Sequence, residues 1–337
     1  MKRLLLLCLI LCLTACNPLY VTRAAWEEAR VLAAREAISD LLARGEISEI
    51  DRVKLELVRD AGNFAREIGL TEKPPYRSFS RVDRPTFSWV LVACRPDSFE
   101  LFSWWFPVLG NVPYKGYFEK SDAERMGRYL SEMGYEISIR PADAISTLGW
   151  FDDPLLSTAL KNESSILVNI VFHEALHTKI WLPEDVAYNE TLASFTGARA
   201  SIDFFLSREA ACQTESCRKD NDALLSRARE IMAFELELSD TLDLMFPEME
   251  ALFESDKSRD EKLKLRLEIF NRHITPLRAR YPKWQGLREL NNADLIQQRL
   301  YATSMRSFRD EFEKCDSNWG CFLGAVQERT DPGLTRD

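Results

Sequence analysis

Apolar residues near the start of the chain recur at the spacing of amphipathic helices. Residues 22–43 carry a broad apolar face, and Gly45 supplies a stop signal directly after it. Residues 48–68 repeat the pattern behind Ser48, which is a good helix-capping residue. We expect these two helices to pair as an antiparallel hairpin.

The pattern changes between residues 74 and 140, where β-branched and aromatic residues cluster in short runs. Arg95-Pro96-Asp97 has turn chemistry and separates two of these runs. The expected strands are residues 86–94, 98–104, 115–118 and 135–140, with a helix at 121–133 that ends at Gly134.

The rest of the chain is predicted to be almost wholly helical. The expected helices are residues 162–177, 182–208, 220–255, 259–280 and 287–315, followed by a loose tail at 331–337. Pro247 should break the third of them, because proline removes a helical hydrogen bond.

These patterns indicate an α+β protein that is mostly helical, with a small mixed or antiparallel sheet. The expected organisation is a signal segment (1–15), an N-terminal helical hairpin (16–70), a sheet-containing catalytic region (71–207) and a helical C-terminal region (208–330).

The main candidate for chemistry is the H-E-x-x-H sequence His173-Glu174-Ala175-Leu176-His177. Positions four apart on a helix share one face, so His173 and His177 can both bind one zinc ion. Glu174 lies next to the first ligand and can take a proton from the attacking water. The alternative is a pair of helix histidines in a salt-bridge network.

A third metal ligand is expected thirteen positions after His177, at Glu190. A turn and a second, antiparallel helix would bring this carboxylate back to the histidines. Two histidines and a glutamate with an open fourth position form the catalytic zinc set of thermolysin. Small Ala193 and Gly197 would let the two helices approach closely, and Glu184 is the rival ligand.

H-E-x-x-H followed by Asn189-Glu190-x-x-Ala193 resembles the gluzincin metallopeptidases. Residues 106–118 and 146–154 also look like stretches of the bacterial putative aminopeptidases predicted to be membrane lipoproteins. The resemblance covers most of the chain. It implies a peptidase that binds one zinc ion and acts on peptides, and it also implies the aminopeptidase class.

The gluzincin resemblance also implies a substrate-binding strand just before the zinc helix, which we place at Thr147-Leu148-Gly149. The alternative for these residues is a structural loop. Members of this fold type often take a donor for the oxyanion from a Tyr or His in the later helical region. Tyr301 and His273 are the candidates, and Tyr114, Tyr117 and Tyr188 remain alternatives.

Residues 1–16 have the features of an export signal. Lys2 and Arg3 precede a ten-residue apolar run that is too short to span a bilayer. Leu13-Thr14-Ala15-Cys16 resembles the lipobox of bacterial lipoproteins, which implies lipidation at Cys16 and a lipid-anchored location in the cell envelope, with the protein on the periplasmic side. The alternative is an ordinary secretory signal.

The chain is acidic, with a formal net charge of −9. Loss of residues 1–15 would remove Lys2 and Arg3 and lower the charge to −11. An acidic chain without a basic stripe argues against nucleic-acid binding. Export permits disulfides, and the simplest pairing is Cys212 with Cys217 and Cys315 with Cys321, which leaves Cys94 as a buried thiol.

The sequence is therefore compatible with three functions: an aminopeptidase, an endopeptidase acting on envelope proteins, and a non-catalytic envelope protein that uses zinc structurally. The first needs acids that bind a substrate ammonium group, and Asp152, Asp153 and Glu184 are the candidates. The third would have a closed fourth coordination position.

Overall fold

A computed structural model describes residues 18–106, 110–142, 152–183, 185–287 and 290–330. The α-helices are α2 (Pro18–Ala33), α3 (Ile38–Arg44), α4 (Glu49–Glu67), α5 (Lys120–Glu132), α6 (Ser164–His177), α7 (Val186–Ala211), α8 (Glu215–Glu254), α9 (Arg259–Arg280), α10 (Asn292–Tyr301), α11 (Met305–Lys314) and α12 (Trp319–Thr330). The strands are β1 (Glu36–Ala37), β2 (Ser78–Ser80), β3 (Ser88–Cys94), β4 (Trp104–Phe106), β5 (Gly110–Val112), β6 (Lys115–Tyr117), β7 (Glu136–Ala142) and β8 (Leu155–Leu156). Two short 3-10 helices, η1 (Ala159–Lys161) and η2 (Gln285–Leu287), complete the elements.

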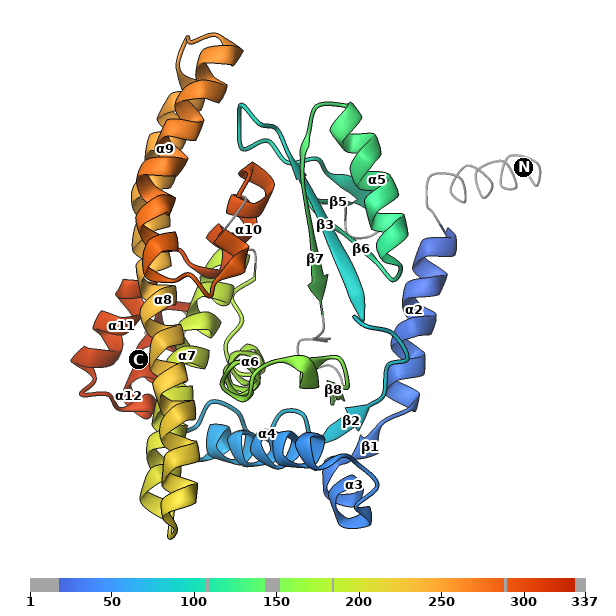
Figure 1. Ribbon diagram of the computed structural model, residues 1–337, viewed down its shortest axis with the longest axis vertical. Coiled ribbons are helices and arrows are strands. Elements are labelled where there is room, and N and C mark those ends of the chain that lie inside the picture. The colour runs from blue at the N-terminus through green and yellow to red at the C-terminus, as the bar shows by residue number, and fades with distance from the viewer. Residues whose placement is uncertain (1–17, 107–109, 143–151, 184, 288–289, 331–337) are drawn as a thin grey trace, which may run out of the picture.

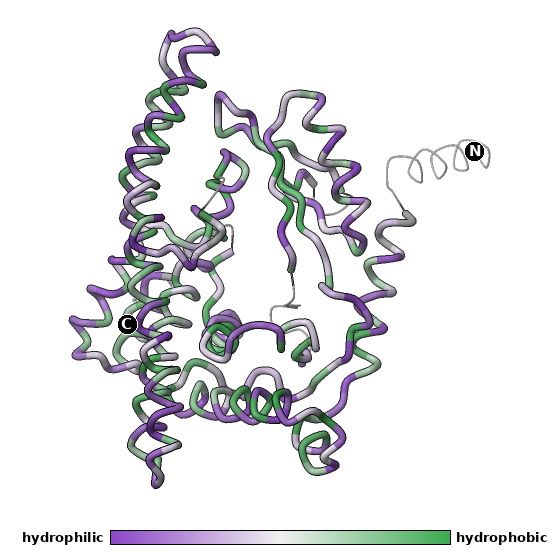
Figure 2. The backbone as a smooth tube through the Cα atoms, in the orientation of Figure 1, coloured by the Kyte–Doolittle hydropathy of each residue, from purple (hydrophilic) through white to green (hydrophobic). Residues whose placement is uncertain are grey.

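The protein is a mostly helical α+β fold, as the sequence predicts. Helices α8 and α9 form a long antiparallel pair along one side, and β3, β7 and α5 lie across from them (Figure 1). Apolar and polar positions alternate along the helices, as expected for helices that bury one face (Figure 2). None of the helices within the described ranges is both long and apolar enough to cross a bilayer.

The prediction of an N-terminal helical hairpin is wrong for its first helix. Residues 22–43 do not form one helix, because α2 ends at Ala33 and the chain enters β1 before α3. Strand β1 pairs with β2, and the Ile38 amide donates to the Arg77 carbonyl at 2.9 Å. These long-range backbone bonds replace the helical bonds that the local sequence favours. Only α3 and α4 remain as a hairpin, and Gly45 ends α3 in a left-handed conformation as expected.

The main sheet has the order β6-β3-β7 and is antiparallel throughout. Helix α5 covers it, and Gly127 permits close contact, because a Cβ there would lie 3.2 Å from the Ile137 side chain. A second small sheet has the order β1-β2-β8, in which β2 and β8 are parallel. The strand expected at 98–104 is reduced to one bridge between Cys94 and Leu101, and the next strand, β4, starts only at Trp104.

Two expectations for the helical half are also wrong. Pro247 does not break α8, which continues to Glu254 because the residues around the proline are buried against neighbouring helices. The helix expected at 287–315 is interrupted between Tyr301 and Met305. Ser304 adopts a left-handed conformation there, and its amide donates to the Asp243 carboxylate on α8 at 2.9 Å. A contact from another helix thus ends α10 at Tyr301.

Two large apolar clusters hold the helical part together. The larger one joins α4, α6, α7, α11 and α12, and the other joins α8, α9 and α10. Disulfides Cys212–Cys217 and Cys315–Cys321 close the α7–α8 and α11–α12 turns, and Cys94 is a buried free thiol, so the cysteine prediction is confirmed.

Candidate metal centre and cavity

Helix α6 carries His173, Glu174 and His177 and is held in place by an apolar surround. Six of its apolar residues are fully or almost fully buried: Leu167, Val168, Val171, Phe172, Ala175 and Leu176. His177 is itself only 6% exposed. The helix is therefore fixed by packing, and its polar side chains are left to face a cavity.

Helix α7 runs antiparallel to α6 at very short range. A Cβ added to Gly197 would lie 2.5 Å from Asn169 Oδ1 and 2.9 Å from the Asn169 carbonyl oxygen. Only glycine allows this approach, as the sequence predicts, and it brings Glu190 back to the histidines. Buried Asn189 fixes the start of α7, since its side chain accepts a hydrogen bond from the Leu182 amide and donates one to the Leu182 carbonyl, both at 2.8 Å.

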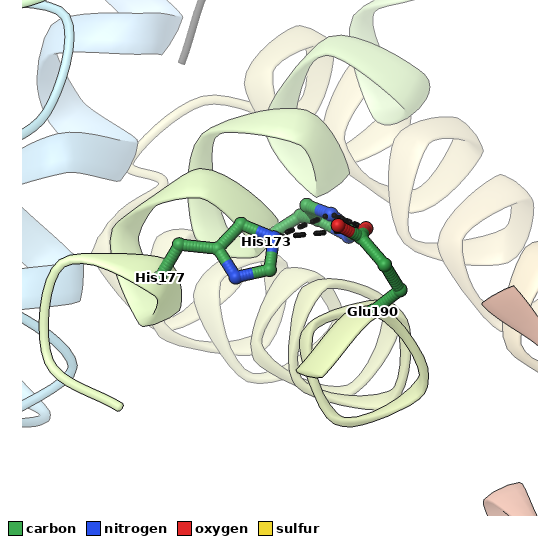
Figure 3. Close-up of side chains that lie close together, drawn as sticks. All are labelled: His173, His177 and Glu190. Atoms are coloured by element: carbon green, nitrogen blue, oxygen red, sulfur yellow. Dashed lines mark hydrogen bonds and ion pairs between the residues drawn. The ribbon is translucent and has the colours of Figure 1, made fainter. Parts of the chain in front are cut away.

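His173, His177 and Glu190 converge on one point (Figure 3). The His173 Nε2 atom lies 3.2 Å from His177 Nε2 and 3.2 Å from Glu190 Oε2. The third edge, His177 Nε2 to Glu190 Oε2, is 3.7 Å. The rival ligand Glu184 lies outside the described residues.

These distances fit a small tetrahedral cation. A tetrahedron with zinc–ligand bonds of 2.0–2.1 Å has edges of roughly 3.4 Å, which is within the range of the three distances. Hydrogen bonds alone explain the triangle poorly, because a single imidazole proton cannot serve both close contacts of His173 Nε2. Two imidazoles and one carboxylate are also the donor types that zinc prefers in catalytic sites.

The electrostatics of the triangle favour a positive charge. Burial alone would raise the pKa of Glu190, but hydrogen bonds from His173 and His177 outweigh it and lower this pKa to about 2. Burial opposes the charged form of His173, yet its pKa is raised by the Glu190 hydrogen bond and by the nearby charge of Glu174. Both shifts are in the direction that favours a positive charge beside the Glu190 carboxylate.

A cavity of about 590 Å³ opens beside the triangle. Its wall includes Glu174 and the three residues of the triangle, together with Tyr76, Pro141, Ala142, Pro154, Leu155, Leu156, Ala159, Asn162, Asn169, Ile170, Trp181 and Tyr301. Asn169 lies four positions before His173 on α6, so helical spacing could have identified it, whereas Trp181 lies beyond the end of α6 at His177. Tyr76 had no signal in the sequence that we recognised.

The structure brings Tyr301 to the site and places His273 elsewhere. The Tyr301 ring lies 6.3 Å from the His173 ring, and Tyr301 lines the cavity. Desolvation of the phenol, followed by the charges of Glu190 and Glu174, raises its pKa, although the residue as a whole is still 47% exposed where it borders the cavity. His273 pairs with Glu248 at 2.9 Å between α9 and α8 and is not among the cavity residues.

The other residues predicted from the sequence either lie outside the described residues or do not line the cavity. Thr147, Leu148, Gly149 and Cys16 lie outside the described residues. Ala142, which directly precedes residues 143–151, and Pro154, three positions after them, both line the cavity. The hydroxyls of Tyr117 and Tyr188 are buried without a hydrogen-bond partner in the described part of the chain, and neither tyrosine lines the cavity.

The family described as "Putative aminopeptidase" matches residues 19–333. The chain belongs to this family. The matched range contains every residue of the cavity. No curated protein and no solved structure matches the chain. Membership in the putative aminopeptidase family supports peptidase activity in general.

Proposed function

We propose that the protein is a zinc-dependent peptidase that holds one zinc ion between His173, His177 and Glu190. The observation that carries the proposal is the triangle of ligand atoms, 3.2–3.7 Å on each side, at the wall of a cavity that also contains Glu174. Zinc would supply a Lewis acid that polarises the peptide carbonyl and lowers the pKa of water toward neutrality.

The chain's own residues then perform the proton transfers. Glu174 accepts the proton of the attacking water and passes it to the leaving amine, so that the C–N bond breaks without releasing an anionic amine. Tyr301 keeps its proton and donates a hydrogen bond toward the carbonyl oxygen as negative charge develops on it.

The proposed specificity is removal of N-terminal residues, which the family description supports. Among the acids considered for binding a substrate ammonium, Asp152 forms an ion pair with Arg77 at 2.5 Å, and Glu184 is not described. Glu174 and Glu190 are the carboxylates in the described cavity wall. This last observation favours the endopeptidase as the second candidate, because Asp153 is near enough for its charge to raise the pKa of Tyr76 but does not itself line the described part of the cavity.

A non-catalytic role for zinc is the weakest of the three functions. The triangle lies at a cavity wall beside a carboxylate that is not one of the ligands, whereas a structural site surrounds its metal with protein. We further propose that a lipid at Cys16 anchors the protein in the bacterial cell envelope, with the catalytic part on the periplasmic side.

The function is tested with a panel of peptides whose N-termini are free or acetylated. The wild-type protein should hydrolyse free peptides, and Glu174→Gln should retain zinc while losing at least about 100-fold in kcat, as expected for loss of a general base. Hydrolysis of acetylated peptides at the same rate as free peptides would contradict the aminopeptidase and support the endopeptidase. A Glu174→Gln protein as active as the wild type would refute the role of Glu174. Incorporation of labelled palmitate in bacteria, and its loss in Cys16→Ala, tests the anchor.

A further inference from the structure

Tyr76 is a buried cavity residue with a rare backbone conformation. It follows α4, lies just before β2, and is only 6% exposed. Its φ angle is +52°, in the left-handed region that bulky residues seldom occupy. Such conformations persist only where the surroundings enforce them, and they cluster at ligand-binding sites.

The surroundings of Tyr76 enforce this conformation from both sides. Before it, Pro74 and Pro75 lie directly on α4 at Gly62, where an added Cβ would be 3.2 Å from the Pro75 carbonyl oxygen. After it, β2 pairs with β8, whose two residues line the cavity. The chain has little freedom between these two attachments, so the tyrosine ring is held in the cavity wall.

Tyr76 is a buried side chain in the cavity wall, and its hydroxyl is not one of the described buried polar atoms that lack a partner, so we take it as a group that borders the cavity space. Burial raises the pKa of Tyr76 well above its ordinary value, and the charges of Glu174 and Asp153 raise it further. The group is therefore a protonated donor near Glu174. A phenol at a cavity wall can donate a hydrogen bond to a ligand in that cavity, and the acceptors that any peptide offers are its main-chain carbonyls.

We propose that Tyr76 is a substrate-binding residue whose hydroxyl donates a hydrogen bond to a main-chain carbonyl of the bound peptide, on the Glu174 side of the cavity. The inference rests on the proposed peptidase function. Tyr76 and Tyr301 then have separate tasks, because Tyr76 binds the peptide in the ground state and Tyr301 acts on the reacting carbonyl.

Peptide binding in a background that cannot hydrolyse the peptide tests this directly. A penta-alanine peptide with a C-terminal fluorophore would be titrated into Glu174→Gln protein with and without Tyr76→Phe. Loss of one hydrogen bond should weaken binding about three- to tenfold. Tyr117→Phe is the matched control, because it removes a buried hydroxyl away from the cavity and should leave the affinity unchanged.

A second variant tests the positioning of Tyr76 without touching the cavity. Gly62→Ala should push the Pro75 carbonyl away and weaken peptide binding, with little further loss when Tyr76→Phe is added. Gly127→Ala has a similarly tight contact, 3.2 Å from Ile137, and should not change binding.

In the active enzyme, Tyr76→Phe should raise KM with little change in kcat, because the bond is made equally in the ground and transition states. If the wild type cleaves peptides but Tyr76→Phe binds them with unchanged affinity, the role of Tyr76 is refuted while the peptidase function stands. A lower kcat with a shifted pH profile would also refute this role, since Tyr76 would then act through Glu174. A wild-type protein that neither binds nor cleaves peptides would overturn the peptidase function itself.

Discussion

Gly197→Ala should disturb the metal centre from a position that contacts neither zinc nor substrate. The new Cβ would lie 2.9 Å from the backbone carbonyl of Asn169 and 2.5 Å from its side-chain oxygen. The amide side chain can rotate, but the carbonyl is part of α6 and cannot. Ordinary contact needs about 3.5 Å, so the two helices must separate by roughly half an ångström.

This separation is large for a metal site, in which ligand distances hold within about 0.2 Å. Glu190 moves with α7 and the histidines with α6, so zinc affinity should fall by about 10- to 100-fold. The free energy of unfolding of the metal-free protein should be affected less than zinc affinity. Alanine stabilises a helix by about 0.5–1 kcal/mol relative to glycine, which offsets part of the overpacking cost of about 1–3 kcal/mol. The Tm of the metal-free protein should fall by a few degrees.

The assay is a competition titration with a zinc-binding dye, combined with thermal unfolding of the metal-free protein. Gly324→Ala is the control, because it makes the same exchange in α12, where the new Cβ would meet no described atom within 4 Å apart from its chain neighbours and the backbone of its own helix. It should keep wild-type zinc affinity and be neutral or slightly stabilising. Wild-type zinc affinity in Gly197→Ala would refute the argument that close α6–α7 packing sets the ligand geometry.

Three further predictions concern single side chains. If Tyr301 is the oxyanion donor, Tyr301→Phe should lower kcat by about 100-fold in steady-state kinetics, while the zinc content stays unchanged. His273→Gln should keep wild-type kcat and KM, because His273 pairs with Glu248 away from the cavity; a large loss of kcat would restore it as a candidate. Burial raises the pKa of Glu235 from its ordinary value of 4.5 to about 8. Between these two pH values the folded metal-free protein keeps a proton on Glu235, whereas the unfolded chain has released it. Stability should therefore fall as the pH rises from about 4.5 to 8, and Glu235→Gln should raise Tm more at pH 8 than at pH 5; equal shifts would contradict this.

The sequence predicted the parts of the site that depend on local spacing. His173 and His177 share a helix face by periodicity alone, and Gly197 indicated close helix packing. Glu190 was the expected third ligand, with Glu184 as the rival, because a short turn and a second, antiparallel helix would bring its carboxylate back to the histidines. The cysteine pairing followed in the same way, from short separations between neighbouring helices.

Features that depend on distant contacts could not be predicted. Residues 34–37 have helical composition but leave the helix to pair with β2, which lies some forty residues later. The end of α10 at Tyr301 is set by Asp243 on another helix. Tyr76 has an unremarkable sequence context, and only the packing of Pro75 on Gly62 shows why it faces the cavity. In each case a contact across the fold decides a local conformation.

Zinc content is the most direct test of the central claim. Purified protein, loaded with zinc and passed through a desalting column, should contain one zinc ion per chain by mass spectrometry of the metal. Glu190→Gln and His177→Ala should each lose most of it, whereas Glu174→Gln should retain it. A metal-free wild type, or a Glu190→Gln protein that binds zinc as tightly as the wild type, would contradict the proposed centre.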